Sequence, residues 1–308
     1  MIAIVFNPAA RGNRATAFRA RLTIAARTAQ SAQRRVVLRP SRSAGDAVLQ
    51  AREAVLQGCT TIVAAGGDGT VNEVVNGIAQ IEDGPQRVRL GVLPLGTVNV
   101  FAKELRIPVD FAAGWQLLLN GGERRVDFGI ADYVGGDPSV VRRRWFVQMA
   151  GAGLDSLALE KVSWALKKKV GPLAYVWAGL QALVGTLPRV EAEVDGRKVS
   201  GQLALIGNGR FYGGRWVVFP GAQLTDGRLD LAMVEHVSPL RFPRQFAALA
   251  RGRFEAAPGL VHWQGREITL RSVHAADSAI PFHVEGDNMG HLPAKFSLDS
   301  RSLRVIAP

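Results

Sequence analysis

The chain has 308 residues, of which 47% are hydrophobic, and its mean hydropathy of +0.08 excludes an intrinsically disordered protein. This length favours two domains over one very large domain. The formal net charge of +12 and sequence pI near 10.7 predict an acidic partner, such as nucleic acid, an anionic membrane surface or a phosphorylated substrate. A solvated basic surface without a partner is the alternative.

The single cysteine and the apolar segments indicate the cellular compartment of the protein. One cysteine, Cys59, excludes an intrachain disulfide and a cysteine-rich zinc site, and its position before an apolar run predicts a small core residue. Residues 1–6 reach Asn7 and Pro8 too soon for a signal peptide. The longest apolar stretch, residues 173–187, is shorter than the ~20 residues that a transmembrane helix needs. We therefore expect a cytoplasmic protein that can still touch membranes.

Strand-like and helix-like segments alternate along the first 120 or so residues. Short apolar or β-branched runs predict strands at 2–6, 35–38, 61–65 and 89–93. The segment 44–57 has a helical stripe of apolar residues and a natural stop at Gly58. This alternation favours a parallel α/β sheet, which binds ligands at the carboxyl ends of its strands. Asn7, Asp68 and Thr97 follow such strands, so we expect their loops to line one crevice.

The run from Gly66 through Gly67, Asp68 and Gly69 to Thr70 is the most informative motif, because it joins a buried strand to a helix. Glycines permit positive φ, so backbone N–H groups can converge on an anion, and the helix N-terminus adds further donors. An aspartate there would repel phosphate unless it binds a divalent cation or orients a hydroxyl. The alternative is a tight turn in which Asp68 caps the helix.

The chain changes character after Gly121 and Gly122, where strand-like runs become separated by turn signals. The predicted strands include 145–149, 190–194, 203–206, 229–234 and 267–270. Helical segments interrupt them near 157–187 and 239–252. We expect residues 1–125 to form an α/β domain and residues 126–308 a mainly antiparallel β domain, whose last strand can return to the first.

Basic and aromatic residues gather in the two helical segments. The members are Lys161, Lys167, Lys168 and Lys169 with Trp164, Tyr175 and Trp177, and Arg241, Arg244, Arg251 and Arg253 with Phe242, Phe246 and Phe254. Such a mixture suits an interfacial helix on anionic lipid or a site for single-stranded nucleic acid. An ordinary core-facing stripe with snorkelling cations is the alternative.

Several motifs in order resemble the diacylglycerol kinase catalytic family, which includes sphingosine and ceramide kinases. In the first half they are residues 7–10, 66–73 and 95–99, and in the second half 151–155, 207–214, 220–222, 226–230 and 285–287. The match runs almost from end to end. The resemblance implies an α/β nucleotide-binding domain joined to an antiparallel β-sandwich domain, with ATP bound between them and Mg²⁺ as the metal.

The resemblance also implies roles for individual residues. The residues expected to contact ATP are Asn7, Ser41, Gly66, Gly67, Asp68, Gly69, Thr70, Val71, Asn72 and Thr97. Asp226, with the backbone carbonyls of Gln223 and Arg228, resembles a magnesium site. Asp68 binds or orients magnesium in this interpretation. Asp287 takes the proton of a lipid alcohol that attacks the γ-phosphate, and Glu285 shares that role or supports it.

Three positions depart from the family pattern. Arg11 stands where the first loop usually has glycine, although Arg11 and Arg14 can themselves reach phosphates. Val100 replaces a frequent aspartate. The late motif reads Glu-Gly-Asp instead of Asp-Gly-Glu, which makes the base one methylene shorter, and a shift of ~1 Å in a reacting group affects rate strongly.

Other functions remain open from the residues. An NAD kinase shares a Gly-Gly-Asp-Gly loop, whereas a dinucleotide oxidoreductase fits poorly because residues 151–153 lack the third glycine and the following acidic residue. A non-enzymatic basic binder of membrane or nucleic acid is the rival from another class. The expected partners are a lipid substrate and, peripherally, an anionic membrane surface; a homodimer is possible and nucleic acid is not expected. The five histidines show no metal spacing.

Overall fold

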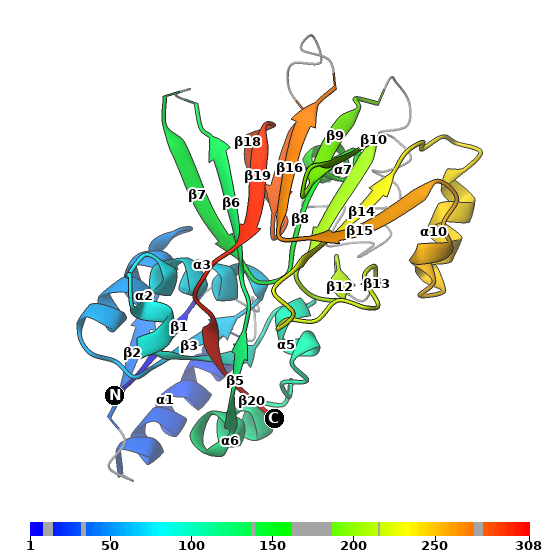
Figure 1. Cartoon of the computed structure of the whole chain (residues 1–308). Coiled ribbons are helices and arrows are strands. Elements are labelled where there is room, and N and C mark those ends of the chain that lie inside the picture. Colours follow the sequence, from blue (N-terminus) through cyan, green and yellow to red (C-terminus); the bar gives the residue numbers. More distant parts are fainter. Residues whose placement is uncertain (9–14, 32–34, 137–138, 162–186, 215, 274–279) are drawn as a thin grey trace. The chain divides into compact units, whose positions relative to one another are not determined.

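The computed structural model describes residues 1–308 except 9–14, 32–34, 137–138, 162–186, 215 and 274–279 (Figure 1). The chain divides into two compact units. The first comprises Met1–Phe128 together with Asp299–Pro308, and the second comprises Gly129–Leu298. Among the described residues, no helix has the length and apolar character needed to cross a membrane.

The first unit is built on a six-stranded sheet with the order β2-β1-β3-β4-β20-β5. The strands are β1 (Ile2–Phe6), β2 (Val36–Pro40), β3 (Thr61–Gly66), β4 (Arg89–Pro94), β5 (Gly122–Val126) and β20 (Leu303–Ala307). Neighbouring pairs from β2 through β20 are parallel, and β5 is antiparallel to β20. Every residue of β3 is buried, as its continuous apolar run predicts for a sheet covered on both faces.

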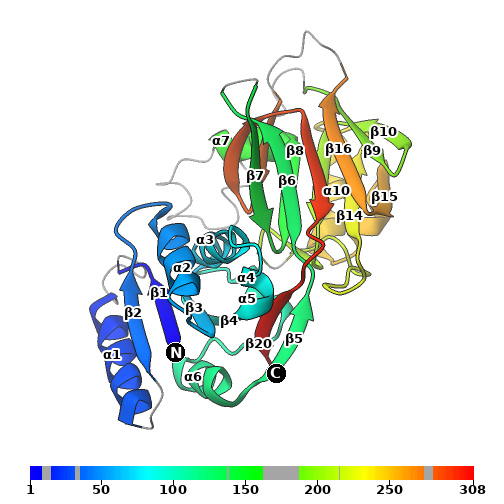
Figure 2. The ribbon, with the colours of Figure 1, turned by 60° about the vertical axis from the view of Figure 1, so that its left-hand side comes forward.

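Helices cover both faces of this sheet (Figure 2). They are α1 (Ala15–Ser31), α2 (Asp46–Leu56), α3 (Asp68–Ala79), α4 (Gly84–Arg87), α5 (Val100–Glu104) and α6 (Phe111–Asn120). Leu22 of α1 and Trp115 of α6 pack in one apolar cluster with Ile4 and Val63 of the sheet, so these two helices share a face. Helix α2 packs against α3 so closely that a Cβ at Gly77 would lie 2.3 Å from the Val48 carbonyl oxygen.

The second unit contains two six-stranded sheets with the orders β10-β9-β16-β19-β6-β7 and β15-β14-β11-β8-β17-β18. Their strands are β6 (Gly129–Val134), β7 (Val141–Phe146), β8 (Met149–Gly153), β9 (Val190–Val194), β10 (Arg197–Gly201), β11 (Leu203–Gly207), β14 (Leu229–Val234), β15 (Leu260–Gly265), β16 (Glu267–Ser272), β17 (Pro281–Val284), β18 (Asp287–His291) and β19 (Ala294–Leu298). All the neighbouring pairs within these sheets are antiparallel. Phe146, Phe282 and Phe296 pack edge to face in the shared core.

Short elements complete the second unit. They are β12 (Phe211–Tyr212), β13 (Trp216–Val217), α7 (Leu154–Lys161), α10 (Phe242–Ala250) and a 3₁₀ turn at Phe254–Ala256. The fold therefore confirms the predicted α/β domain followed by an antiparallel sandwich. The Asp299–Pro308 segment, which carries β20, belongs to the first unit.

Two sequence predictions need correction at this level. The strand expected at 145–149 is interrupted, because β7 ends at Phe146, residues 147–148 form a bend and β8 begins at Met149. The bend is stabilised by a side chain from a distant loop, described below, which local sequence cannot reveal. Helix α10 is shorter than expected and begins at Phe242. Most of the helix expected at 157–187 lies outside the described residues.

Candidate active site

The loops that follow four parallel strands lie at one edge of the first unit's sheet. Phe6 at the end of β1 is in register with Pro40 of β2 and Ala65 of β3, and Gly66 is in register with Pro94 of β4. The predicted contact residues Asn7, Ser41, Asp68 and Thr97 follow or begin just beyond these strand ends. Asn7 and Thr97 are exposed. The strands that precede these residues therefore end at one edge of the sheet, and the crevice between their loops stays a prediction.

Ser41 is more enclosed than its neighbours in this group. Its side chain is largely buried, and its backbone N–H donates to the Phe6 carbonyl oxygen at 2.8 Å. Its Oγ lies 3.4 Å from the same oxygen. Ser41 thus links the end of β2 to the end of β1 through a hydrogen bond. Its predicted contact with ATP stays a prediction.

The glycine loop between β3 and α3 is shaped by close approach. Positive φ, which the sequence suggested, is wrong here: neither Gly66, Gly67 nor Gly69 has φ in the left-handed region. A Cβ at Gly66 would instead lie 2.3 Å from Thr70 Oγ1, and a Cβ at Gly96 would lie 2.7 Å from the Cα of Gly67. Gly66 and Gly96 are required because helix α3 and the loop after β4 approach the backbone too closely for side chains, whereas a Cβ at Gly69 would have no atom within 4 Å.

Asp68 does not cap its own helix, so the alternative interpretation of this residue is wrong. Helix α3 has Gly67 at its N-cap position and no side-chain capping hydrogen bond. The Asp68 carboxylate oxygen Oδ1 accepts a hydrogen bond of 3.4 Å from the backbone N–H of Phe101, at the start of α5. Burial raises the pKa of Asp68, and backbone N–H groups from Asn99 to Phe101 oppose that rise. Asp68 therefore joins the loops after β3 and β4 while keeping a titratable group at this edge.

Two predicted nucleotide contacts lie inside the unit. Val71 and Asn72 are 2% and 0% exposed. The Asn72 side-chain oxygen accepts a 2.8 Å hydrogen bond from Asn76 Nδ2, so this amide is engaged within α3. Both side chains are packed into the core, and the predicted contact of Val71 and Asn72 with ATP stays a prediction. Their buried side chains anchor the first turns of α3 to the core of the first unit.

Glu73, the next residue, has a structural role that sequence reasoning did not assign. Its two carboxylate oxygens accept hydrogen bonds of 3.1 Å from the backbone N–H groups of Gly45 and Ala47. These donors belong to the N-terminus of α2, which lacks another side-chain cap. Glu73 thus fixes α2 to α3. The sequence signals for this contact were the acidic residue in the first half of the predicted helix after the glycine loop and the glycine, Gly45, at the start of α2.

In the second unit, the acidic motif at 285–287 forms the hairpin turn between β17 and β18. Val284 pairs with Asp287, and the two turn residues Glu285 and Gly286 have φ of 54° and 84°. Such positive φ angles suit a two-residue hairpin turn. Asp287 is therefore the first residue of strand β18.

The two acidic residues of this hairpin have different surroundings. Glu285 Oε1 accepts hydrogen bonds of 2.8 and 2.7 Å from the backbone N–H groups of Val147 and Gln148, and so stabilises the bend between β7 and β8. The Asp287 side chain is 59% exposed and lies 3.7 Å from Arg144 Nη2. Asp287 is consequently the more accessible carboxylate, and Glu285 is the supporting one.

The loop predicted to hold a metal supplies few ligands. Asp226 Oδ1 accepts a 3.0 Å hydrogen bond from the Arg228 backbone N–H, and the Asp226 N–H lies 3.4 Å from the Gln223 carbonyl oxygen. One carboxylate and backbone carbonyls are the hard oxygen donors that Mg²⁺ prefers. Among the described residues, however, no three His, Cys, Asp or Glu side chains converge as a metal-binding group. The donor chemistry fits Mg²⁺, with water needed to complete its coordination.

A buried polar cluster in the second unit was not predicted. Asp155, at the start of α7, accepts hydrogen bonds of 2.5 Å at Oδ2 from Tyr212 Oη and from His283 Nε2. The Gly286 N–H donates to His283 Nδ1, which places the ring proton on Nε2. A Cβ at Gly151 would lie 2.3 Å from Tyr212 Oη, so this glycine makes room for the cluster.

The contacts within this cluster shift the pKa values of Asp155 and Tyr212. Burial alone would raise the pKa of Asp155, but attraction to His283 and the hydrogen bonds from His283 and Tyr212 lower it on balance. Burial and the nearby Asp155 raise the pKa of Tyr212 well above its ordinary value, which keeps its hydroxyl protonated. Sequence analysis assigned no role to His283, because its partners lie 128 and 71 residues away along the chain.

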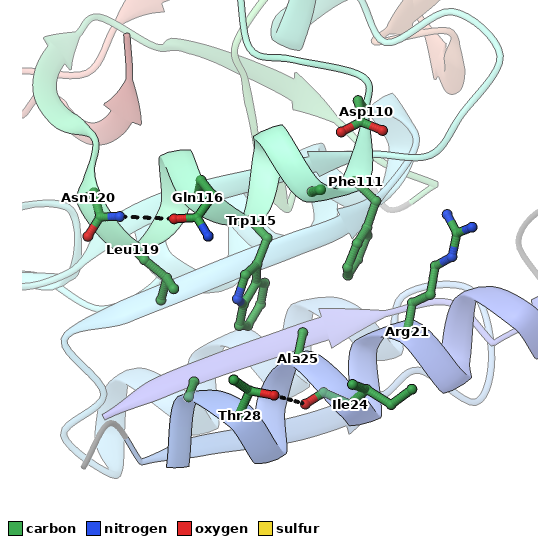
Figure 3. A pocket seen from close by; sticks show the side chains of 12 residues that line it. Arg21, Ile24, Ala25, Thr28, Asp110, Phe111, Trp115, Gln116, Leu119 and Asn120 are labelled. Atoms are coloured by element: carbon green, nitrogen blue, oxygen red, sulfur yellow. Dashed lines mark hydrogen bonds between the residues drawn. The ribbon is translucent and has the colours of Figure 1, made fainter. Parts of the chain in front are cut away.

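A pocket of about 680 Å³ lies elsewhere in the first unit, between α1 and α6 (Figure 3). Phe111 and Trp115 of α6 point toward Ile24 and Ala25 of α1 in this pocket. None of the predicted site residues lines it. The pocket is therefore separate from the candidate active site.

Comparisons with known proteins identify the family of the chain. Residues 1–131 match the diacylglycerol kinase catalytic domain, and residues 148–307 match the YegS C-terminal NAD kinase beta sandwich-like domain. A diacylglycerol kinase of Staphylococcus aureus (strain bovine RF122 / ET3-1) is 33% identical over 272 residues, covering 86% of this chain and 79% of the relative. The chain belongs to the diacylglycerol kinase catalytic domain family.

A second relative and a solved structure agree with this family assignment. A diacylglycerol kinase of Staphylococcus carnosus (strain TM300) is 30% identical over 271 residues, covering 87% of this chain and 83% of the relative. A crystal structure of a diacylglycerol kinase from Bacillus anthracis str. Sterne superimposes with a TM-score of 0.76 at 22% identity, covering 100% of this chain and 96% of the other. The structural likeness establishes the shared fold.

Proposed function

We propose that this protein is an ATP-dependent lipid kinase that transfers the γ-phosphate of ATP to a hydroxyl of a lipid such as diacylglycerol or a sphingoid base. The observation that carries the proposal is the convergence of Asn7, Asp68 and Thr97 with the glycine loop at one edge of the sheet. The names of the relatives support a diacylglycerol kinase reaction.

In this proposal the residues of the first unit hold the nucleotide. Backbone N–H groups of Gly67 and Gly69 at the start of α3, with the Thr97 hydroxyl, bind the phosphates. The Asp68 carboxylate holds or orients Mg²⁺, and the metal when bound neutralises charge that develops on the transferred phosphoryl group. Hydrogen bonding to the α5 backbone keeps the Asp68 carboxylate in one orientation. Asp226 holds a second ion through its carboxylate and neighbouring carbonyls.

The second unit supplies the base. Asp287 accepts the proton of the acceptor hydroxyl as that oxygen attacks the γ-phosphorus, while the leaving oxygen remains on ADP. Its exposed carboxylate is accessible for this step. Glu285 holds the neighbouring bend in place through its two backbone hydrogen bonds.

Labelled ATP tests the reaction directly. The purified protein is incubated with γ-labelled ATP, Mg²⁺ and mixed micelles that contain diacylglycerol, monoacylglycerol, sphingosine, ceramide or phosphatidylglycerol, and with NAD in a parallel reaction. We expect one labelled phospholipid and no labelled NADP. Labelled NADP without labelled lipid would establish an NAD kinase instead, which the name of the second matched domain makes the relevant comparison.

A matched pair of variants tests the base. Asp287→Asn should lower kcat by about 100-fold or more, since general-base catalysis contributes roughly that much. The free energy of unfolding should be unchanged because this side chain is exposed. Asp83→Asn is the control, because the Asp83 side chain is 58% exposed in the first unit and pairs with Arg87 on the surface. Equal kcat in both variants would remove Asp287 from the mechanism.

A further inference from the structure

One surface of the second unit combines exposed cations with an exposed aliphatic side chain. It consists of Leu240, Arg241, Arg244, Arg251 and Arg253, which we call the α10 basic face. All five residues are exposed, and Leu240 is 89% exposed. Leu240, Arg244 and Arg251 are spaced at intervals of four and seven residues, so they follow the same side of the helix and its flanks.

The opposite side of α10 attaches the helix to the rest of the unit. Gln245 is 5% exposed, and its Nε2 donates 3.0 Å hydrogen bonds to the carbonyl oxygens of His236 and Pro258. Phe242 stacks on Phe246 with ring centroids 6.2 Å apart, and Phe246 meets Trp216 edge to face at 5.8 Å. These inward contacts hold the α10 basic face in one orientation relative to its own unit.

The charge of this face is uncompensated among the described residues. No Asp or Glu occurs between His236 and Phe254. None of the four arginines forms an ion pair with a described residue, whereas Arg143 and Arg304 elsewhere pair with Asp132 and Glu123 at 2.7 Å. Four arginines and an exposed leucine therefore lie on the surface of this segment, and the nearest acidic residues along the chain are Glu235 and Glu255 at its two ends.

We propose that the α10 basic face docks this protein on an anionic lipid bilayer. The inference rests on the proposed function, because a lipid kinase must reach an acceptor that is held in a membrane. The arginines bind lipid phosphates, and Leu240 enters the boundary between head groups and acyl chains. Single-stranded nucleic acid fits less well, because Phe242 and Phe246 stack within the unit and leave the outward stripe without a ring for a base.

The expected affinities follow from the composition of the face. A basic residue near an anionic surface strengthens binding by roughly five-fold at low salt. Removing two arginines should therefore weaken vesicle binding by about 25-fold. Replacing Leu240 with serine should weaken it by about 10-fold, since a buried leucine side chain contributes on that order. High salt should reduce binding of the wild-type protein, because surface charge is screened.

Vesicle sedimentation without ATP tests the proposal. Vesicles of phosphatidylcholine with about one third phosphatidylglycerol are compared with pure phosphatidylcholine. The double variant Arg244→Gln/Arg251→Gln is compared with Arg19→Gln/Arg21→Gln, which removes two exposed charges from α1. Each double variant lowers the formal charge from +12 to +10. We expect the α10 variant to lose binding and the α1 variant to keep it. Equal losses would show diffuse attraction and overturn the proposal.

A label at position 240 tests insertion. Cys59 is the single cysteine and is buried, so a polarity-sensitive fluorophore on Leu240→Cys reports mainly from the new site. The labelled wild-type protein corrects for any reaction at Cys59. Fluorescence should rise on addition of the anionic vesicles and remain constant with phosphatidylcholine alone. A constant signal with both vesicles, or tighter binding to a DNA oligomer that the α10 variant loses, would overturn the proposal.

The kinase assay separates failure of docking from failure of the proposed function. On a short-chain acceptor dissolved without vesicles, Arg244→Gln/Arg251→Gln should turn over at the wild-type rate. If the wild-type protein phosphorylates lipid but both double variants bind vesicles equally, docking through α10 is wrong. If it binds vesicles through α10 but phosphorylates no lipid, docking stands and the proposed function is wrong.

Discussion

Two partly buried aspartates, one in each unit, follow strands and begin helices, but their pKa values shift in opposite directions. Asp68 follows β3 and begins α3, and Asp155 follows β8 and lies in the first turn of α7; both are preceded by glycines. Burial raises the pKa of Asp68, whose hydrogen-bond donors among the described residues are backbone N–H groups. Burial also acts on Asp155, but His283 and Tyr212 lower its pKa on balance. The local sequence therefore places each aspartate at the start of a helix, whereas residues distant in the chain determine the direction of its pKa shift.

Replacing each aspartate with asparagine should produce the largest difference in the free energy of unfolding. Asp155→Asn should lower the free energy of unfolding by roughly 3 kcal/mol at pH 7, because it removes the carboxylate oxygen that accepts hydrogen bonds from His283 Nε2 and Tyr212 Oη. Asp68→Asn should leave it within about 0.5 kcal/mol or increase it, because the folded state disfavours the charged form. Urea unfolding measures both. Equal destabilisation by the two variants would contradict the comparison.

The pH dependence of stability should have opposite signs at the two sites. The stabilisation from Asp155 is fully present above its ordinary pKa near 3.8 and is lost as pH falls through its lower folded value. The cost of ionising Asp68 is absent below about 3.8 and appears as pH rises through its higher folded value. Unfolding free energies of the wild type minus each Asn variant, measured from acid to neutral pH, should change in opposite directions. A common direction would refute the assigned pKa shifts.

The glycines before and after Asp68 should differ in their tolerance of a side chain. Gly66→Ala should destabilise the protein by about 2 kcal/mol, since its Cβ would overlap the Thr70 side chain. Gly69→Ala should be neutral or slightly stabilising, because no atom lies within 4 Å of its Cβ and α3 includes this residue. Thermal unfolding compares the two. A neutral Gly66→Ala would mean that α3 can move away from the loop.

The smallest effect is expected from the Tyr212 hydroxyl. Tyr212→Phe keeps the ring contact with His283 and removes one donor to Asp155, so a loss of about 1 kcal/mol is expected. The double variant Tyr212→Phe/Asp155→Asn should cost less than the sum of the single changes, because the two side chains share one hydrogen bond. Additive losses in urea unfolding would show that the hydroxyl acts independently of Asp155.

Local sequence predicted the elements because their periodicity is a local property. The apolar run of β3 and the helical stripe of α2 identified both elements, and the alternation between them predicted the parallel sheet. The same reasoning placed Asn7, Asp68 and Thr97 at one edge. It could not give the reason for the glycines, because the close approach of Gly67 to Gly96 joins two loops that are 29 residues apart.

The rest of the site depends on contacts between distant segments. Capping of α3 was the alternative interpretation of Asp68, but its carboxylate meets the start of α5, 33 residues away. Asn72 is expected to contact a nucleotide, and sequence did not reveal that its side-chain oxygen accepts a hydrogen bond from Asn76 within the core. Asp155 and His283 are 128 residues apart and become partners only when β8 and β17 pair. No spacing rule connects such residues before the fold is known.

The most direct test of the account measures transfer of labelled γ-phosphate to lipid by the wild-type protein and by Asp68→Asn. Both proteins are first matched by their urea unfolding, so that activity is compared between equally folded samples. The account predicts a labelled phospholipid from the wild type and at least about 100-fold less from Asp68→Asn, because that carboxylate orients the charge-neutralising ion. Equal labelling by the two proteins, or no labelled lipid from the wild type, would contradict it.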